Sequence, residues 1–225
     1  MPAPDHTAGD DATLLERLTA ALPTGLTLEL DGRYAAMFSY KMKTYALLDG
    51  RGRLRLKGSA FRSRGLEPFQ RRLIEEIVRL LVTGAAADAK AIIDRWLADF
   101  AAHRVDVRTF ARTETLQEPL EIYRERVASG VRAPSAAYEL AAASGRPVQA
   151  GDQISYYVTG RTARVPVNEA AKLASAWDRE HPDENVEYYQ AKVLEIWQRF
   201  RRFTEIDGLI PYAEDEADSA QLSLF

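Results

Sequence analysis

The chain has 225 residues, of which 46% are hydrophobic and 28% are charged, and its net charge is −3. These values exclude a disordered chain and suit one large domain or two modest ones. The absence of cysteine excludes disulfides, thiolate zinc sites and thiol nucleophiles, and the three histidines do not have the spacing of metal ligands. No apolar run approaches the ~20 residues that cross a bilayer, and the first residues do not resemble a signal peptide, so we expect a cytoplasmic protein without membrane contact.

The charge is distributed unevenly along the chain. Residues 33–72 hold eleven basic and two acidic residues, which gives this stretch a net charge of +9. Residues 204–220 hold six acidic residues and no basic one. Because a local patch sets the electric field that a ligand meets, the basic stretch predicts either a site for a polyanion or a solvated basic surface.

The first sixty residues predict a helix followed by an antiparallel sheet. We expect residues 1–11 to be disordered, and leucines at helical spacing from Leu14 to Leu22 to form a helix that ends at Pro23. Leucines at 26, 28 and 30 alternate with polar residues, which predicts a half-buried strand. A further strand is expected over residues 34–48, then a tight turn at Asp49-Gly50 and a returning strand over residues 51–57.

The rest of the chain predicts mostly helices. Three apolar stripes at helical spacing indicate packing faces, one from Phe69 to Leu81, one from Ile92 to Phe100 and one from Tyr189 to Phe203. A helix rich in alanine is expected over residues 133–143, and a short strand over residues 153–159. The fold class is therefore α+β, with a small antiparallel sheet in residues 12–65, a helical module in residues 66–210 and a disordered acidic tail in residues 211–225.

Both strands of the expected hairpin carry basic residues at alternate positions, so each strand would present its cations on one face, about 7 Å apart. The residues are Arg53, Arg55 and Lys57 on one strand and Lys41, Lys43 and Tyr45 on the other. A two-residue loop would pair Leu48 with Arg51 and separate the two faces. A three-residue loop would pair Leu48 with Gly52 and join them into one cationic face that suits a phosphate backbone. Both registers remain open.

Five motifs, spread over about residues 22–203, resemble the end of the palm and the thumb of family B DNA polymerases. Lys43-Thr44-Tyr45 is similar to the K-x-Y element of that family, and Lys57-Gly58 with Arg62-Ser63-Arg64 resembles the K-G segment and arginine pair that follow it. Three thumb motifs follow in the family's order: P-L-x-x-Y at 119–123, G-D-x-I-x-Y-x-V at 151–158, and N-V-E-Y-Y at 185–189, where the family has D-x-E-Y-Y.

The resemblance implies that the chain holds primer–template duplex DNA. In the family, the K-x-Y lysine and tyrosine approach the minor groove, whose acceptors occur on every correct base pair, and the arginines hold phosphates. Together with Arg53 and Arg55 of the expected cationic hairpin, the candidate DNA-binding residues are Lys43, Tyr45, Lys57, Arg62 and Arg64. Two segments depart from the family and put DNA contacts there in doubt: Gly65-Leu66 replaces an acidic residue and a tryptophan, and Leu116-Gln117-Glu118 lacks the cation that relatives often have.

The catalytic motifs of a polymerase are missing from the sequence. The family supplies carboxylates for two metal ions from D-x-x-S-L-Y-P and Y-x-D-T-D segments, and neither occurs here. The acidic pair Asp10-Asp11 lies in a polar stretch, and we do not expect it to bind metal. We therefore expect no catalytic residue and no bound cofactor in this chain. Mg²⁺ would be held by a catalytic polymerase chain that carries the exonuclease, the fingers and the other palm motifs.

The last five residues resemble the Q-L-x-L-F peptide that docks on the bacterial sliding clamp. Exposed Leu222, Leu224 and Phe225 would fill an apolar pocket, and the Gln221 amide would orient them through hydrogen bonds. The acidic stretch before them would act as a tether. The alternative is that these residues fold back onto the thumb.

Two other functions remain open. One is a stand-alone DNA-binding or clamp-binding adaptor built from a polymerase thumb, and the other is a helical module whose basic hairpin binds an acidic protein. A neighbouring chain that ends in Y-x-D-T-D would favour a polymerase portion over an adaptor. A steep salt dependence of duplex binding would favour DNA over an acidic protein. A polymerase portion would act at the nucleoid in DNA replication or DNA repair, and the sequence does not choose between the two.

Overall fold

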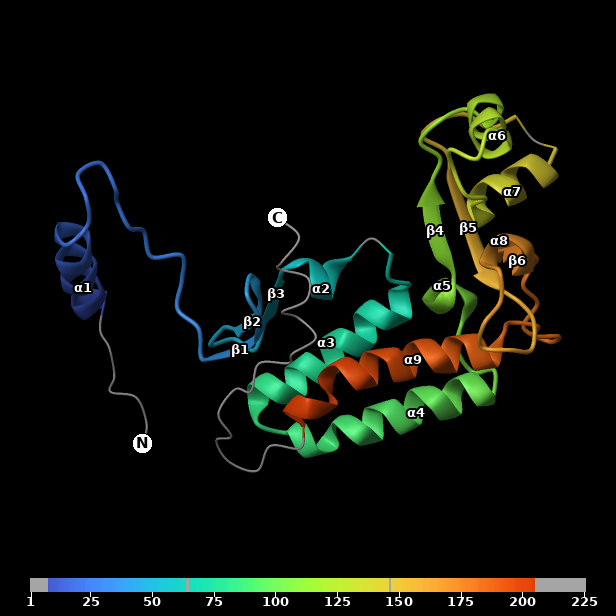
Figure 1. The fold of residues 1–225 in the computed structure, drawn as a ribbon. Coiled ribbons are helices and arrows are strands. Elements are labelled where there is room, and N and C mark those ends of the chain that lie inside the picture. Colours follow the sequence, from blue (N-terminus) through green and yellow to red (C-terminus); the bar gives the residue numbers. More distant parts are fainter. Residues whose placement is uncertain (1–7, 64, 146, 205–225) are drawn as a thin grey trace.

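The computed structural model describes residues 8–63, 65–145 and 147–204, and its fold is α+β as predicted. Three long helices, α3 (Pro68–Thr83), α4 (Ala89–Ala101) and α9 (Val186–Phe200), pack against one another and form the body of the molecule (Figure 1). A three-stranded sheet packs on this body, and a second sheet forms an arm that leads away from it. Within the described ranges, no helix is long and apolar enough to cross a membrane.

The three predicted apolar stripes form the three long helices. Helix α3 begins after Glu67, whose backbone N–H donates to Gln70 Oε1, and Pro68 occupies the first turn, where its missing N–H costs nothing. It ends at Gly84, which takes the left-handed conformation with φ 78. Phe69, Phe100 and Tyr189 meet at ring-centroid distances of 5.1–5.9 Å, so each helix contributes an aromatic ring to one shared core.

The first sheet consists of β1 (Ala36–Lys41), β2 (Thr44–Leu48) and β3 (Leu54–Lys57), antiparallel and in that order. Its inward side chains pack on the helical core, and the following short helix α2 (Ser59–Arg62) adds Phe61 to the same cluster. Tyr40 of β1 contacts the rings of Phe61 and Phe200 at 5.6 and 5.3 Å. The sheet and the helical body therefore share one hydrophobic core.

The structure corrects two expectations about this sheet. Residues 34–48 are not one strand, because the chain turns at Met42 and Lys43, so Lys41 lies on β1 and does not share a strand with Lys43. Neither expected hairpin register forms: Leu48 pairs with Leu54, and five residues connect the strands. The loop is longer because the Asp49 carboxylate accepts hydrogen bonds from the backbone N–H groups of residues 51 and 53, which closes a wider turn.

The strand expected at residues 26–31 does not form. Helix α1 (Ala8–Ala20) is present and begins inside the stretch expected to be disordered, and the chain then runs without secondary structure to β1. Leu26, Leu28 and Leu30 are exposed, since nothing in the described part of the chain covers them. Figure 1 shows α1 apart from the body, joined to it by this extended segment.

The arm is a second antiparallel sheet with its own hydrophobic core. Strands β4 (Arg112–Thr115), β5 (Gln153–Val158) and β6 (Ala171–Leu173) pair in that order, and the predicted strand at 153–159 and alanine-rich helix are both confirmed. Helices α6 (Leu120–Ala128) and α7 (Ala136–Ala143) cover the arm and form its end. The remaining short elements are η1 (Ala86–Asp88), α5 (Val107–Phe110), α8 (Val167–Ala170), η2 (Ala174–Ala176) and η3 (Arg201–Phe203).

Candidate nucleic-acid interface

The outward face of the β1–β3 sheet places an aromatic ring opposite a lysine. Tyr45 of β2 pairs with Lys57 of β3, and Leu47 pairs with Arg55. Because alternate residues point to opposite faces of a strand, Tyr45, Arg55 and Lys57 share the face that points away from the core. Arg55 and Lys57 are exposed and Tyr45 is half-buried. A ligand on this face would meet two cations beside a ring.

Lys43 lies at the turn between β1 and β2, next to the end of β3. Its φ of 60 is uncommon for a residue other than glycine. A Cβ atom on Gly58 would lie 2.5 Å from the carbonyl oxygen of Lys43 and 2.5 Å from Oγ1 of Thr44, so the two segments are in close contact. The structure thus brings the Lys43 backbone beside the end of β3, where Lys57 lies, although the predicted side-by-side pairing of the two lysines on the ladder does not occur.

Arg53 belongs to the loop rather than to β3, and an acidic residue engages it. Its Nε donates to Asp49 Oδ2 at 2.7 Å. Hydrogen bonds from Arg53 and Arg51 hold the pKa of Asp49 below its ordinary value. The charge of Arg53 is therefore partly balanced within the protein.

Arg55 borders a shallow hollow that the sequence did not predict. Its Nη1 donates to the hydroxyl of Tyr34 at 3.3 Å, and its guanidinium lies 6.0 Å from the centre of that ring. The hollow has a volume of ≈ 420 Å³ and includes Arg33 and Arg51 in its wall. Arg33 precedes β1, Arg51 lies in the loop and Arg55 lies on β3, so the fold brings together residues that are up to 22 positions apart in the chain.

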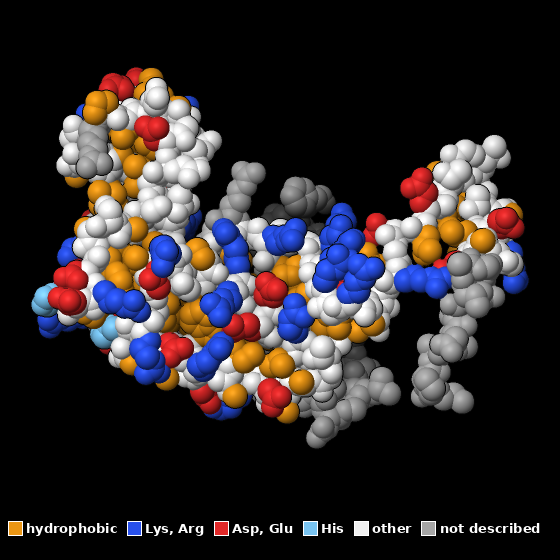
Figure 2. Space-filling view, turned by 180° about the vertical axis from the view of Figure 1, so that it is seen from behind, with side chains coloured by type: hydrophobic (Ala, Val, Ile, Leu, Met, Phe, Trp, Pro, Cys, Tyr) orange, Lys and Arg blue, Asp and Glu red, His pale blue; other side chains and the backbone are white. Residues whose placement is uncertain are grey.

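Arg62 is the last residue of α2 and is exposed. A hydrogen bond attaches this helix to the body: Nη2 of Arg199 on α9 donates to the backbone carbonyl of Ala60 at 2.8 Å. Arg64 and the C-terminal peptide Gln221, Leu222, Leu224 and Phe225 lie outside the described residues. Figure 2 shows Lys and Arg side chains gathered over the part of the body next to the N-terminal helix.

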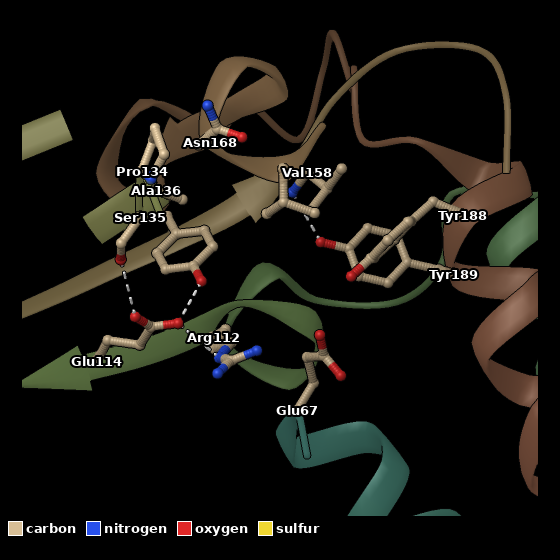
Figure 3. A pocket seen from close by; sticks show the side chains of 12 residues that line it. Glu67, Arg112, Glu114, Pro134, Ser135, Ala136, Val158, Asn168, Tyr188 and Tyr189 are labelled. Carbon is tan, nitrogen blue, oxygen red and sulfur yellow. Dashed lines mark hydrogen bonds and ion pairs between the residues drawn. The ribbon is translucent and has the colours of Figure 1, made fainter. Parts of the chain in front are cut away.

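A polar cavity of ≈ 280 Å³ lies where the arm meets the helical body (Figure 3). Glu67 at the start of α3 faces it, and burial raises the pKa of this carboxyl, against the opposing effect of Arg112. Arg112 Nε is 2.8 Å from Glu114 Oε1 but is not oriented to donate a hydrogen bond to it, so the contact is ionic. The Tyr156 hydroxyl donates to the same carboxylate at 2.5 Å. The sequence did not predict this site, because its residues come from distant segments.

Comparison with known proteins identifies the family. The family model for DNA polymerase family B matches residues 11–200. The chain belongs to DNA polymerase family B.

Two relatives show how much of a polymerase this family B chain represents. It is 28% identical over 180 residues to a DNA polymerase of Methanocaldococcus jannaschii, a match that covers 78% of the chain and 10% of that protein. Its fold is similar to that of the family B DNA polymerase of the archaeon Pyrobaculum calidifontis, with a TM-score of 0.64 and 18% identity. This match covers 91% of the chain and 25% of that protein. The chain thus spans a tenth of the curated relative and a quarter of the solved one.

The thumb-like motifs of this family B chain have structural roles. Tyr123 of the P-L-x-x-Y motif is buried and stacks on Tyr138 with ring centroids 4.2 Å apart. Tyr189 of the N-V-E-Y-Y motif is buried in the main core and accepts a hydrogen bond from the Val158 backbone N–H at 2.9 Å. The two tyrosines therefore help to fix the arm and its attachment to the body.

One of the two segments that depart from the family has an internal role. Glu118 forms ion pairs with Arg126 and Arg132, so its single carboxylate is shared by two cations at the end of the arm. Leu116 is buried. The segment therefore presents no cation of its own to a ligand.

Proposed function

We propose that this chain is the palm-end and thumb portion of a family B DNA-directed DNA polymerase, and that it holds primer–template duplex DNA. Residues 12–65 would be the palm end and residues 66–210 the thumb. The observation that supports this most strongly is the outward face of the β1–β3 sheet, where Tyr45 and Lys57 lie opposite each other and Lys43 lies beside the end of β3.

The chemistry of this face suits a double helix of any sequence. A lysine ammonium donates hydrogen bonds to the minor-groove acceptors, which are similar in all base pairs, so Lys43 and Tyr45 would sense duplex shape. Arg53, Arg55, Lys57 and Arg62 would hold phosphates on either side, and we propose the same for Arg64. Such contacts fix position without reading sequence.

We propose that nucleotidyl transfer takes place on another polypeptide portion. Among the described residues, no group of three or more acidic or histidine side chains is placed to hold a metal ion. Asp11 is engaged by Arg33, whose Nε donates to it at 2.6 Å. We propose that the portion with the exonuclease, fingers and remaining palm motifs supplies the two-metal centre together with Mg²⁺.

Duplex binding by lysine variants tests the DNA-binding proposal. With about five phosphate contacts, log affinity for a primer–template duplex should fall with log salt with a slope of roughly −4 to −5. Lys43→Ala with Lys57→Ala should weaken binding about tenfold or more for every duplex sequence and reduce the size of the slope by about 1, because only Lys57 of the two is proposed to contact a phosphate. The control is Lys90→Ala with Lys172→Ala, which removes the same charge from positions that already pair with Asp94 and Asp183. Equal affinity of the two double variants would contradict the proposal.

We further propose that Gln221, Leu222, Leu224 and Phe225 bind the bacterial sliding clamp. Deleting residues 221–225 should abolish binding to purified clamp and leave duplex binding unchanged. Loss of both together would mean that the peptide is part of the fold. If the protein without residues 221–225 still binds the clamp, the proposal that this peptide is the clamp-binding site is wrong.

The alternative proposal is a stand-alone DNA-binding or clamp-binding adaptor. Such an adaptor would not need the catalytic motifs that the sequence lacks. Primer extension separates the two. The chain mixed with a polypeptide that carries the other family B motifs should extend a primer processively, and either one alone should not. An adaptor would leave extension by that polypeptide unchanged.

A further inference from the structure

Strands β4 and β5 of the arm pass into the body at a single pair of residues. Phe110 and Tyr157 belong to the hydrophobic core of the body. Leu116 and Tyr156 belong to the separate core of the arm. Arg112 pairs with Tyr156 in the register of the two strands, so this pair lies at the boundary between the cores. Two units with separate cores can turn relative to each other at such a boundary with little loss of packing.

The contacts of Arg112 at this boundary are incomplete. Its Nε lies 2.8 Å from Glu114 Oε1, yet this buried nitrogen donates no hydrogen bond within the described residues. Glu114 has other donors, since its carboxylate also accepts hydrogen bonds from the hydroxyls of Tyr156 at 2.5 Å and Ser135 at 3.5 Å. Glu114 would therefore remain hydrogen-bonded if Arg112 moved away from it.

A second carboxyl lies near Arg112, on the body. Glu67 at the start of α3 is 4% exposed, and burial raises the pKa of its carboxyl, which Arg112 and Lys192 oppose through space. Figure 3 shows the Arg112 guanidinium between the carboxyl groups of Glu114 and Glu67, with a dashed contact to Glu114 alone. Lys192 pairs with Glu195, so Arg112 is the better placed cation for Glu67.

We propose that Arg112 positions the arm by exchanging partners: it pairs with Glu114 in the described orientation and with Glu67 when the arm turns toward bound duplex DNA. This inference rests on the proposed function and identifies the residue that sets the angle of the DNA grip. The cavity of ≈ 280 Å³ between arm and body provides the space for the movement.

The exchange is favourable on electrostatic grounds. A buried carboxyl without a counter-ion is disfavoured in its charged form, and a guanidinium beside Glu67 would remove that penalty. One ion pair replaces another, so two discrete orientations of the arm can have similar free energies. Duplex DNA that contacts arm and body together would then select one of them.

Spin labels on the arm and the body test the two orientations in the full chain. The chain has no cysteine, so introduced cysteines are the only sites that a thiol-reactive label modifies. Val131 is 76% exposed on the arm and Leu194 is 44% exposed on α9, which makes Val131→Cys with Leu194→Cys a suitable pair. Double electron–electron resonance should show that primer–template duplex changes the main distance between the labels by more than about 2 Å. An unchanged distance at full occupancy by duplex would overturn the proposal.

Glutamine variants of the labelled chain test the two partners. Glu67→Gln keeps the side-chain size, and it should abolish the change in distance and weaken duplex binding about fivefold or more. Glu114→Gln should shift the distance in the chain without DNA toward that of the duplex complex. Glu76→Gln on α3 removes a carboxylate that pairs with Arg72 and Arg95, and this control should behave as wild type.

Two variants of the arginine separate positioning from a merely structural role. Arg112→Lys keeps the charge and should retain the change in distance that duplex causes, whereas Arg112→Gln should lose it. Urea unfolding shows whether each variant is folded. If the wild-type chain binds duplex but Glu67→Gln and Arg112→Gln keep the wild-type change, the exchange is wrong and the DNA-binding function stands. If the wild-type chain does not bind duplex, the proposed function is wrong and this inference is wrong with it.

Discussion

A Cβ atom on Gly58 would lie 2.5 Å from the carbonyl oxygen of Lys43, a distance that no side chain can occupy. Gly58 also has φ 100, a conformation that residues with a Cβ rarely adopt. The glycine of the K-G segment therefore allows the end of β3 to touch the turn that carries the lysine of the K-x-Y element. The two motifs are one structural unit.

The first prediction concerns this contact. Gly58→Ala should lower the free energy of unfolding by about 2–3 kcal/mol, because backbone strain and a steric clash act together. It should also weaken duplex binding, since Lys43 must move away from Lys57. Urea unfolding and duplex titration measure the two effects.

Gly84→Ala is the matched control. Gly84 also has positive φ, 78, but a Cβ atom there would meet nothing within 4 Å. Only the backbone strain of about 1 kcal/mol should appear, with unchanged duplex affinity. Equal losses in the two variants would mean that the close approach to Lys43 has no energetic consequence.

The second prediction concerns the residue at which the last thumb-like motif differs from its family pattern. Asn185 is fully buried, and its Nδ2 donates to the carbonyl oxygens of Thr159 and Thr162 at 3.2 and 2.9 Å. Its Oδ1 accepts from the Tyr188 N–H and caps α9. Asn185→Asp restores the family residue but should cost about 1–3 kcal/mol in unfolding free energy, since a carboxylate cannot donate to the two carbonyls. An Asp variant as stable as wild type at pH 7 would show that these carbonyls do not need the amide.

The helical body could be predicted from the sequence, because the signals that define a helix lie within the helix itself. The stripe from Phe69 to Leu81 repeats at helical spacing and ends at a glycine, and both features act within one element. The alternation at Leu26–Leu30 was equally clear, yet no strand formed, because a strand also needs a partner that lies outside this segment. The alternation of leucines with polar residues is real, but the prediction that this segment pairs into a sheet was wrong for the described residues.

The candidate site was predictable only in part for similar reasons. The turn at Met42 and Lys43 contains no glycine, proline or asparagine, and Lys43 itself adopts the left-handed conformation. The Asp49 side chain lengthened the loop and shifted the register, which placed Tyr45 rather than Lys43 beside Lys57. Compared with the three-residue loop, the observed register is shifted by two residues, which preserves the side chains that point outward. The sequence did not choose between this shared face and the separated faces of a two-residue loop.

The third prediction tests how the arm is attached to the body. The Tyr189 hydroxyl accepts a hydrogen bond from the buried Val158 N–H. Tyr189→Phe should cost about 1–3 kcal/mol of unfolding free energy, because it leaves that N–H without a partner. Tyr188→Phe is the control, since the Tyr188 hydroxyl has no hydrogen-bond partner within the described ranges, and it should cost less than 1 kcal/mol. A reversed order of the two losses would contradict the assignment.

The last prediction concerns the cavity between arm and body, where the buried Glu67 carboxyl has a pKa raised above its ordinary value of 4.5. Burial is the main cause, opposed by Arg112 and Lys192 and reinforced by Glu195. Because the folded state holds this proton more tightly than the unfolded chain, Glu67 stabilises the fold most below pH 4.5, and that contribution is lost as pH rises through the raised pKa.

Glu67→Gln keeps the size of the side chain and removes its titration. The difference in unfolding free energy, wild type minus variant, should therefore fall as pH rises from 4 to 7. Carboxyls with lowered pKa, such as Asp106 and Asp183, act in the opposite direction but are present in both proteins and cancel in the difference. Urea unfolding of both proteins at four pH values measures this slope. A difference that stays constant or rises with pH would show that the Glu67 carboxyl is not held in its protonated form by burial.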